Sequence, residues 1–233
     1  LSRVTDRICR EREPLGIIYL GGSRVDFSED TSSFKVPCVI VTTSAENWSM
    51  EELSSVAIDD EKAGETIVDY LIEHGHTKIA EIGANLELSQ TAILRHNGYL
   101  NSFKKHGITP DERYYERARF SYDSAYRAMK KLLEKDIEIT AVYAISDVMA
   151  IGAIRAILDK GLRVPEDISI TGFDGSTLAE YYNPKIVSIR QPHKDMAARS
   201  VELLFNMIDL HKGSCHEIIP FELTEGKSVA RID

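Results

Sequence analysis

Polar and aromatic side chains follow several apolar runs of the sequence, either soon after the run ends or in the first turns of the next helix. They are Arg95, Phe120, Ser146, Asp147 and Asp174. A guanidinium fork, two carboxylates, a hydroxyl and an aromatic face suit a polyhydroxylated ligand. Arg and carboxylate can each bond two adjacent hydroxyls, and the face of a sugar or a base packs on an aromatic ring. This set therefore predicts a binding site for a small polar molecule.

Each of these residues also has a structural interpretation. Asp174 follows a run that breaks at a glycine, and it could cap the next short helix. Asp147 stands at the first position of its helix, where a structural role is the simpler explanation. Phe120 could belong to the core, and Arg95 could form a surface ion pair. Their joint placement after strands favours the binding interpretation.

The elements that must position these residues are short strands and longer helices in alternation. The expected strands are 15–20, 37–43, 78–83, 139–145, 167–173 and 185–189, and the expected helices are 59–75, 89–107, 122–136, 146–161 and 193–213. Strands that are apolar on both faces and alternate with helices are typical of a parallel, doubly wound sheet. The fold class is thus predicted to be α/β, and ligands of such sheets bind beyond the carboxyl ends of the strands.

The expected helix ends agree with this assignment. Asp59, Ser89 and Ser146 stand where N-cap residues belong, and glycines at 75, 107 and 161 stand where three helices should stop. The chain has no linker rich in Ser, Gly or Pro. Two lobes joined by several short crossovers would explain both the number of units and the absence of a linker.

Motifs of the common enzyme classes are missing from the sequence. It has no phosphate loop, no dinucleotide-binding glycine pattern, no nucleophile elbow and no zinc-protease helix. Gly21 and Gly22 follow a strand, but a glycine pair is usually a turn. His74 and His76 stand near a helix end without Cys or carboxylate partners at ligand spacing, so no metal site is predicted. No cofactor is expected, and the chain is not predicted to be an enzyme.

Composition and charge limit the partners. Of the 233 residues, 43% are hydrophobic and 28% charged, which is typical of globular proteins. The net charge of −9 disfavours binding of nucleic acid by this chain alone. No apolar run is long enough to span a membrane, and the three widely spaced cysteines, with Cys38 expected to be buried, do not suggest disulfides. A cytoplasmic location is the default expectation.

The motifs in their order resemble the LacI/GalR family of bacterial transcription regulators, specifically its effector-binding region, which is similar to periplasmic sugar-binding proteins. The matching segments are LGIIYLGG, SVAIDDEKAGETIVDYLIEHGHTKIAEIG, RHNGY, AYRAMKKLLEK, TAVYAISDVMAIGAIRAI, GLRVPEDISITGFDGS and PKIVSIRQP. The long GLRVPEDISITGFDG element is the most specific of these. The resemblance covers the chain from about Leu15 onward.

The resemblance implies a two-lobed module, type I in its fold, with a ligand in the interlobe cleft, three crossovers as hinges and homodimerisation through both lobes. One lobe would comprise 1–76 with 191–214, and the other 77–190 with 215–233. Ligand-binding positions of the family match Arg95, Asp174, Phe120, Asp59, Ser89, Thr91 and Ser146. Ser146 stands where many members carry Asn.

Two features of the family are not found in this sequence. One is the N-terminal helix-turn-helix head that enters DNA grooves, and the other is the opening strand, helix and strand of the first lobe. We therefore expect the chain to be a fragment of a full-length regulator that contacts operator DNA through the absent head and senses a sugar or related metabolite. The alternative hypotheses are a solute-binding protein for sugar transport and an enzyme of the same fold class.

Overall fold

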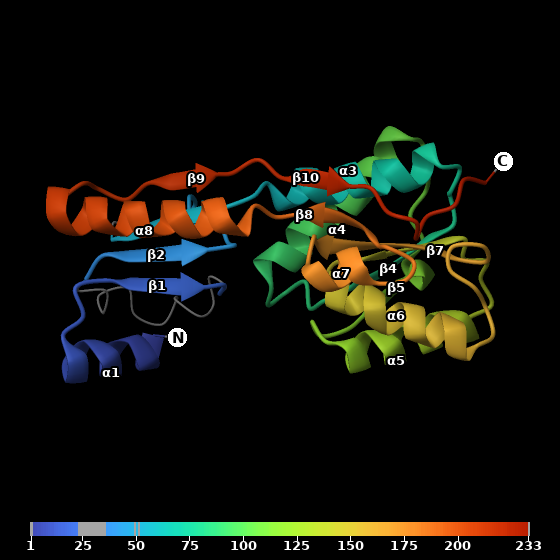
Figure 1. Cartoon of the computed structure of the whole chain (residues 1–233), viewed down its shortest axis with the longest axis horizontal. Coiled ribbons are helices and arrows are strands. Elements are labelled where there is room, and N and C mark those ends of the chain that lie inside the picture. Colours follow the sequence, from blue (N-terminus) through green and yellow to red (C-terminus); the bar gives the residue numbers. More distant parts are fainter. Residues whose placement is uncertain (1, 23–35, 49, 51, 233) are drawn as a thin grey trace. The chain divides into compact units, whose positions relative to one another are not determined.

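A computed structural model describes residues 2–22, 36–48, 50 and 52–232 of the chain. Contacts between Cα atoms divide it into two compact units (Figure 1). Unit 1 comprises 1–59, 88–91 and 192–220, and unit 2 comprises 60–87, 92–191 and 221–233. Each unit is built around its own sheet, and the main chain passes between the units at residues 59–60, 191–192 and 220–221, apart from the short segment 88–91.

Within its described residues, unit 1 contains a four-stranded sheet in the order β1-β2-β3-β9. All its neighbouring strands are parallel, and they span β1 Ile17–Leu20, β2 Cys38–Val41, β3 Leu53–Ala57 and β9 His216–Ile218. The long helix α8, His193–Leu210, packs against β1, β2 and β3. A further helix, α1, spans Ser2–Arg12. Cys38 is fully buried, as expected, in a core that also holds Trp48.

Strand β3 was not predicted from the sequence because two of its five residues are serines. Ser54 and Ser55 are nonetheless almost fully buried. The Ser54 hydroxyl accepts a hydrogen bond from the Cys215 amide at 3.0 Å, and the Ser55 hydroxyl accepts one from the Ala45 amide at 3.0 Å. Buried hydroxyls are tolerated when they are hydrogen-bonded in this way, so β3 belongs to the core although it contains two polar residues.

Unit 2 contains a six-stranded sheet in the order β10-β8-β7-β6-β4-β5 among its described residues. Strands β4 to β8 run parallel and β10 is antiparallel to β8. The strand bounds are β4 Ile79–Gly83, β5 Tyr115–Arg117, β6 Ala141–Ala144, β7 Ser169–Asp174, β8 Val187–Arg190 and β10 Glu222–Thr224. The α/β class with parallel sheets is confirmed.

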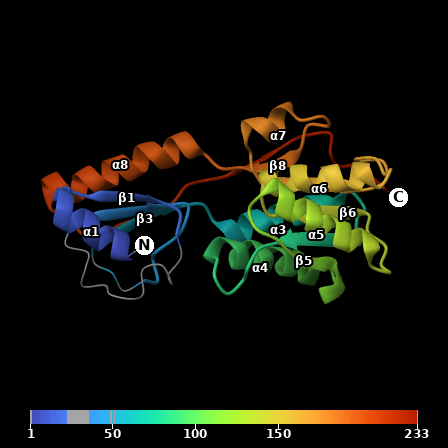
Figure 2. The same cartoon turned by 90° about the horizontal axis from the view of Figure 1, so that it is seen from below.

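Helices cover both faces of the unit 2 sheet. Helices α3 and α4 lie on one side, and α5 and α6 run side by side on the other (Figures 1 and 2). Their bounds are α3 Asp60–Glu73, α4 Gln90–Lys105, α5 Tyr122–Glu134 and α6 Asp147–Asp159, and the short helices are α7 Thr177–Tyr181 and the 3-10 turn η2 Glu112–Tyr114. As predicted, three helices end shortly before the glycines at 75, 107 and 161. All three glycines have positive φ.

Helices α3 and α4 approach each other backbone to backbone. A Cβ at Gly64 of α3 would lie 2.6 Å from the carbonyl oxygen of Arg95, and a Cβ at Gly98 of α4 would lie 2.3 Å from that of Glu61. Any larger side chain would push the helices apart. These two glycines therefore fix the position of the helix turn that carries Arg95.

The observed units differ from the sequence-based lobes at α3, at residues 88–91, which belong to unit 1, and at β9. The sequence assigned residues 60–76 to the first lobe, whereas α3 belongs to unit 2 because it packs on α4 and on strands β6 and β8. Residues 216–218 were assigned to the second lobe, whereas β9 pairs with β3 of unit 1. The expectation that two lobes move about three crossovers as hinges remains a prediction.

The histidines near the end of α3 have structural hydrogen bonds. His74 Nδ1 lies 2.7 Å from the carbonyl oxygen of Tyr70, one turn earlier. His76 is buried, and its ring nitrogens lie 3.1 Å from the Thr140 hydroxyl and 3.0 Å from the Ala230 carbonyl oxygen. Both contacts satisfy polar groups at the end of the helix and beside the sheet.

Candidate functional site

Arg95 is the buried centre of a charged cluster in unit 2. Its side chain is 5% exposed, and its Nε donates to Asp60 Oδ1 at 2.8 Å. Its Nη1 donates to the carbonyl oxygen of Ile145 at 2.6 Å, and the guanidinium lies 3.6 Å over the ring of Phe173. Burial alone would lower the pKa of Arg95, but the charges of Asp60 and Asp174 outweigh it and raise that pKa. Arg95 thus remains a fixed cation.

Asp174 ends strand β7 and faces this cation. Its Oδ1 lies 3.7 Å from Arg95 Nη1 and accepts a hydrogen bond from Gln191 Nε2 at 2.8 Å. Burial raises the pKa of its carboxyl group to about 6, although Arg95 opposes this effect, and the nearby charge of Asp147 adds to it. The side chain keeps 31% exposure, so it is more exposed than Arg95.

Ser146 and Asp147 follow strand β6 and begin helix α6. Ser146 is the N-cap, as predicted, and its hydroxyl accepts from the Met149 amide at 3.3 Å. Asp147 is 1% exposed, and its carboxylate accepts from the Ser188 hydroxyl and from the Ser176 amide, each at 2.6 Å. The structure thus supports the structural interpretation of Asp147. Helix α7 is capped by Ser176 and not by Asp174.

Phe120 lies between β5 and α5 and is 48% exposed. Because β4 to β8 are parallel, the carboxyl end of β5 is at the same sheet edge as the ends of β6, β7 and β8. The core interpretation of Phe120 is therefore wrong, since a core ring would be buried. An exposed aromatic ring at this edge offers an apolar face to a ligand.

Asp59, Ser89 and Thr91 belong to unit 1. Asp59 is exposed and directly precedes α3, and the hydroxyls of Ser89 and Thr91 lie 3.1 Å apart in the segment that leads into α4. The acidic residue paired with Arg95 is the next one, Asp60. Ligand contacts of Asp59, Ser89 and Thr91 stay predictions.

Two members of the cluster were missed from the sequence. Asp60 is the first residue of α3, and only the glycine contact between α3 and α4 brings it to Arg95. Gln191 directly follows strand β8, and the rule that selected the other residues, to take the side chain after each apolar run, applies to it as well. The cluster therefore combines residues from the ends of β7 and β8 with the first turns of two helices.

This arrangement can bind hydroxyl groups. Asp174 accepts hydrogen bonds, Gln191 and Arg95 donate them, and their positions are held by buried contacts, so little ordering is needed when a ligand arrives. Within the described residues, no group of three or more His, Cys, Asp or Glu side chains is placed to hold a metal ion. The cluster has the donors and acceptors needed to recognise a polar, uncharged or weakly charged molecule.

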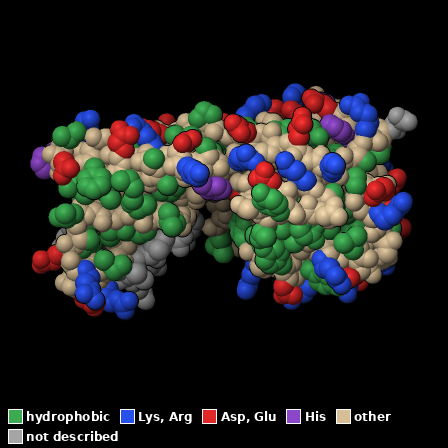
Figure 3. Space-filling view, viewed as in Figure 1, with side chains coloured by type: hydrophobic (Ala, Val, Ile, Leu, Met, Phe, Trp, Pro, Cys, Tyr) green, Lys and Arg blue, Asp and Glu red, His purple; other side chains and the backbone are tan. Residues whose placement is uncertain are grey.

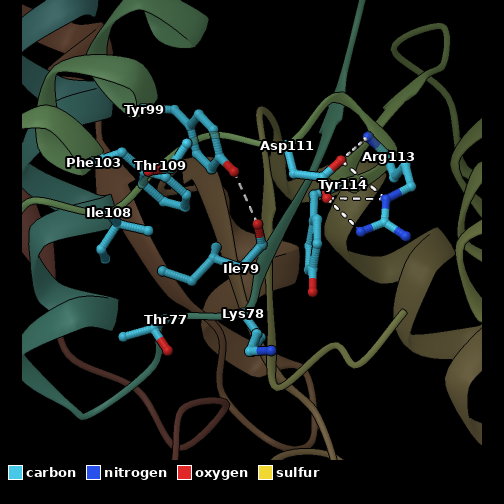
Figure 4. Close-up of a pocket in the computed structure, with 10 residues that line it drawn as sticks. All are labelled: Thr77, Lys78, Ile79, Tyr99, Phe103, Ile108, Thr109, Asp111, Arg113 and Tyr114. Atoms are coloured by element: carbon cyan, nitrogen blue, oxygen red, sulfur yellow. Dashed lines mark hydrogen bonds and ion pairs between the residues drawn. The ribbon is translucent and has the colours of Figure 1, made fainter. Parts of the chain in front are cut away.

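A cavity of about 320 Å³ lies at the opposite edge of the sheet, where β4 begins (Figure 4). Tyr99, Phe103, Ile108 and Tyr114 form its walls, with Lys78 at its base. Tyr99 and Phe103 are already 95% or more buried, so a ligand would bury little additional apolar area there. None of the predicted site residues lines this cavity, and the carboxyl edge remains the better candidate.

Residues 68–229 match the family model described as periplasmic binding protein-like domain. The chain is 38% identical over 225 residues to the HTH-type transcriptional regulator MalR of Clostridium butyricum, a match that covers 96% of this chain and 67% of that protein. It is 34% identical over 189 residues to catabolite control protein A of Priestia megaterium, covering 81% of this chain and 56% of that protein. The chain thus spans between about half and two-thirds of the length of these regulators.

Solved structures of regulators share the fold. A transcriptional regulator CelR–cellobiose complex superposes with a TM-score of 0.87 at 27% identity, covering 97% of this chain and 69% of that one. A LacI family transcriptional regulator from Enterococcus faecium with bound ribose gives a TM-score of 0.83 at 25% identity, covering 100% of this chain and 84% of that one. Among the described residues, no helix combines the length and the apolar character needed to cross a membrane.

Proposed function

The chain belongs to the LacI/GalR family of bacterial transcription regulators, and from that premise we propose that it is the effector-sensing and dimerisation module of a DNA-binding repressor. The effector is a sugar or a related small metabolite. It binds at the carboxyl edge of the unit 2 sheet, where Arg95 and Asp174 are the principal contacts. The proposed set of ligand-binding residues also includes Phe120, Ser146, Asp59, Ser89 and Thr91.

The observation that carries this proposal is the buried Arg95 cluster. A guanidinium that is 5% exposed and bonded to Asp60 and to the Ile145 carbonyl is costly to bury. Such a group is often retained for recognition rather than for stability. Its position beside a partly exposed carboxylate at the carboxyl edge of a parallel sheet is where ligands of this fold class bind.

The chemistry of the cluster supports a sugar-like ligand. Asp174 accepts hydrogen bonds from ligand hydroxyls, Arg95 and Gln191 donate to ligand oxygens, and Phe120 offers a face to the C–H groups of a sugar ring. The matched CelR structure is a complex with cellobiose, and the matched E. faecium regulator holds ribose. Both ligands carry adjacent hydroxyl groups of this kind.

Regulation would follow from linkage between the effector and the DNA. If the effector prefers one conformational state of the regulator, it shifts the equilibrium between operator-competent and incompetent states by no more than its differential affinity, typically about 1–3 kcal/mol. Operator binding would be the task of a helix-turn-helix domain outside this chain, because the net charge of −9 disfavours contact with phosphates here. Such a regulator would act in the cytoplasm.

A second copy of the chain is the proposed partner of an apolar surface on unit 2. Tyr122, Ile151, Arg155 and Tyr182 line a shallow cavity of about 420 Å³ there, and Tyr181 is 83% exposed. Figure 3 shows hydrophobic side chains gathered over this part of unit 2, where α5, α6 and α7 lie in Figure 1. Aromatic residues and Arg are enriched in the core of protein interfaces, so this surface suits homodimerisation.

A solute-binding protein for sugar transport would use the same fold and the same site. The matched relatives are transcriptional regulators, which favours the sensor. The complete gene discriminates the two: a helix-turn-helix coding region upstream supports the regulator, and a signal peptide supports transport. An enzyme is the third hypothesis, and turnover of a sugar by the purified protein would support it.

A thermal-shift screen of this chain with sugars, sugar phosphates and nucleobases tests the proposed function. A ligand present at about 100 times its dissociation constant adds roughly 2.7 kcal/mol to the free energy of unfolding. We expect a positive shift from at least one sugar and its loss in Asp174→Ala. Asp159→Ala, which alters an exposed carboxylate at the far end of α6, should keep the shift. No shift from any sugar, or a shift retained in Asp174→Ala, contradicts the proposal.

A further inference from the structure

Asp147 is a buried carboxylate that the proposed binding chemistry does not use. We propose that Asp147 is a positioning residue for Asp174, because its two oxygens hold the turn that presents Asp174 to the effector. The role is an extension of the proposed function, since it concerns the same ligand-binding carboxylate. Asp147 itself is 1% exposed and is not accessible to a ligand, so it acts only through its neighbours.

The two oxygens of Asp147 reach the residues that directly follow Asp174. Asp147 Oδ2 accepts a hydrogen bond from the Ser176 amide at 2.6 Å. Asp147 Oδ1 accepts from the Ser188 hydroxyl at 2.6 Å, and the same hydroxyl accepts from the Gly175 amide at 3.1 Å. One carboxylate therefore fixes two consecutive amides of the turn, one directly and one through Ser188.

The backbone of this turn needs such support. Asp174 has a φ of +109° and Gly175 a φ of +63°. A non-glycine residue with positive φ is disfavoured and persists only where surrounding contacts hold it. Gly172 lets the support come close, because a Cβ at that position would lie 2.3 Å from Asp147 Oδ1. The absence of a side chain at Gly172 in strand β7 thus leaves room for the Asp147 carboxylate.

Gln191 holds both the side chain and the backbone carbonyl group of Asp174. Gln191 donates from its Nε2 to Asp174 Oδ1 at 2.8 Å and from its amide to the Asp174 carbonyl oxygen at 3.2 Å. Asp147 fixes the turn on the other side of Asp174. Hydrogen bonds on both sides of a strained residue are the arrangement expected where a binding group must be held in one orientation.

Electrostatics provides a second, independent readout. The charged groups that face Asp174 are Arg95 from α4, Asp147 from α6 and Asp60 from α3. Burial is the main cause that raises the pKa of Asp174 to about 6, Arg95 opposes it, and the negative charges of Asp147 and Asp60 contribute to it. Neutralising Asp147 in a variant that stays folded, with Asp174 still buried, should therefore lower the pKa of Asp174.

Hydrogen exchange and NMR titration of this chain test the role without any ligand. In Asp147→Asn one of the two acceptor atoms becomes an amide nitrogen, so we expect at least one of the Gly175 and Ser176 amides to exchange about tenfold faster or more, equivalent to ~1.4 kcal/mol. The ¹³C-detected pKa of the Asp174 carboxyl should fall below its wild-type value. Ser188→Ala should speed exchange of Gly175 but not of Ser176. Asp159→Asn is the matched control and should change neither amide nor the pKa.

The outcomes separate this proposal from the proposed function. Unchanged exchange of both amides together with an unchanged Asp174 pKa in folded Asp147→Asn would overturn the positioning role. If that variant does not fold, Ser188→Ala decides. Exchange of Gly175 that is unchanged from wild type, or that is accelerated no more than that of Ser176, refutes the support that runs from Asp147 through Ser188. Failure of every sugar to bind contradicts only the proposed effector, because neither measurement contains one.

Discussion

Replacing Asp60 by Asn should strongly destabilise unit 2. Asp60 and Arg95 are both buried, with side chains 3% and 5% exposed, and Arg95 Nε lies 2.8 Å from Asp60 Oδ1. The substitution keeps the size of the side chain and one acceptor atom, but it removes the charge that compensates the guanidinium. A buried cation without its partner cannot recover the hydration that it lost on folding.

The expected loss is about 3 kcal/mol in the free energy of unfolding, the lower end of the range of about 3–5 kcal/mol measured when one partner of a buried pair is removed. We expect the lower value because two other contacts of the Arg95 guanidinium are kept. Asp174 remains 3.7 Å from the guanidinium, and the Ile145 carbonyl still accepts from Nη1. Because domains of this size have only about 5–15 kcal/mol of stability, such a loss is readily measured.

Urea unfolding followed by far-UV circular dichroism, with native-state hydrogen exchange of the α4 and β4 amides, measures this loss. The single tryptophan, Trp48, belongs to unit 1, so its fluorescence alone would not report on the site. Asp59→Asn is the matched control, since Asp59 is the adjacent residue, is exposed, and is exchanged for the same amide. A loss below about 0.5 kcal/mol in Asp60→Asn, equal to that of an ordinary surface substitution, would refute the reasoning.

Two further predictions concern the dimer and the pH dependence of stability. Ile151→Glu should convert a dimer into a monomer in sedimentation velocity experiments, whereas Leu88→Glu, which alters an exposed residue of unit 1, should not; a dimeric Ile151→Glu chain would exclude the proposed surface. Burial lowers the pKa of His96, but its 2.6 Å hydrogen bond to buried Glu81 outweighs this and leaves that pKa raised. A raised pKa stabilises the fold below the unfolded value of about 6.5, and this stabilisation is lost as pH rises through the folded value. His96→Gln should therefore flatten the fall in urea midpoint as pH rises above about 6.5, and an unchanged pH profile would show that the pair does not titrate there.

The sequence predicts the parallel sheets well and their polar members poorly. Runs of Ile and Val indicate strands that are buried on both faces, and these runs became β1, β2, β4, β6, β7 and β8. Strand β3 escaped this pattern because Ser54 and Ser55 are buried through hydrogen bonds to residues far along the chain. Helix α1 was not among the expected elements.

The site shows the same division. Arg95 and Asp174 were both predicted, and the structure places them 3.7 Å apart, because residues that follow parallel strands collect at one edge. Asp60 could not be selected over Asp59 from the sequence, since only the packing of α3 on α4 decides which of two adjacent carboxylates reaches the guanidinium. The depth at which Asp147 is buried also depends on a contact with a different strand, β8.

The backbone contact between α3 and α4 determines how this site could be redesigned as a biosensor. Because Gly64 and Gly98 leave no room for larger residues, a mutant library that varies these two positions would disturb the packing that holds Arg95. Phe120 lies outside this constraint, with its ring half exposed. Substitutions at Phe120, with Arg95 and Asp60 kept, would change which molecule the biosensor detects while the buried ion pair of the site stays intact.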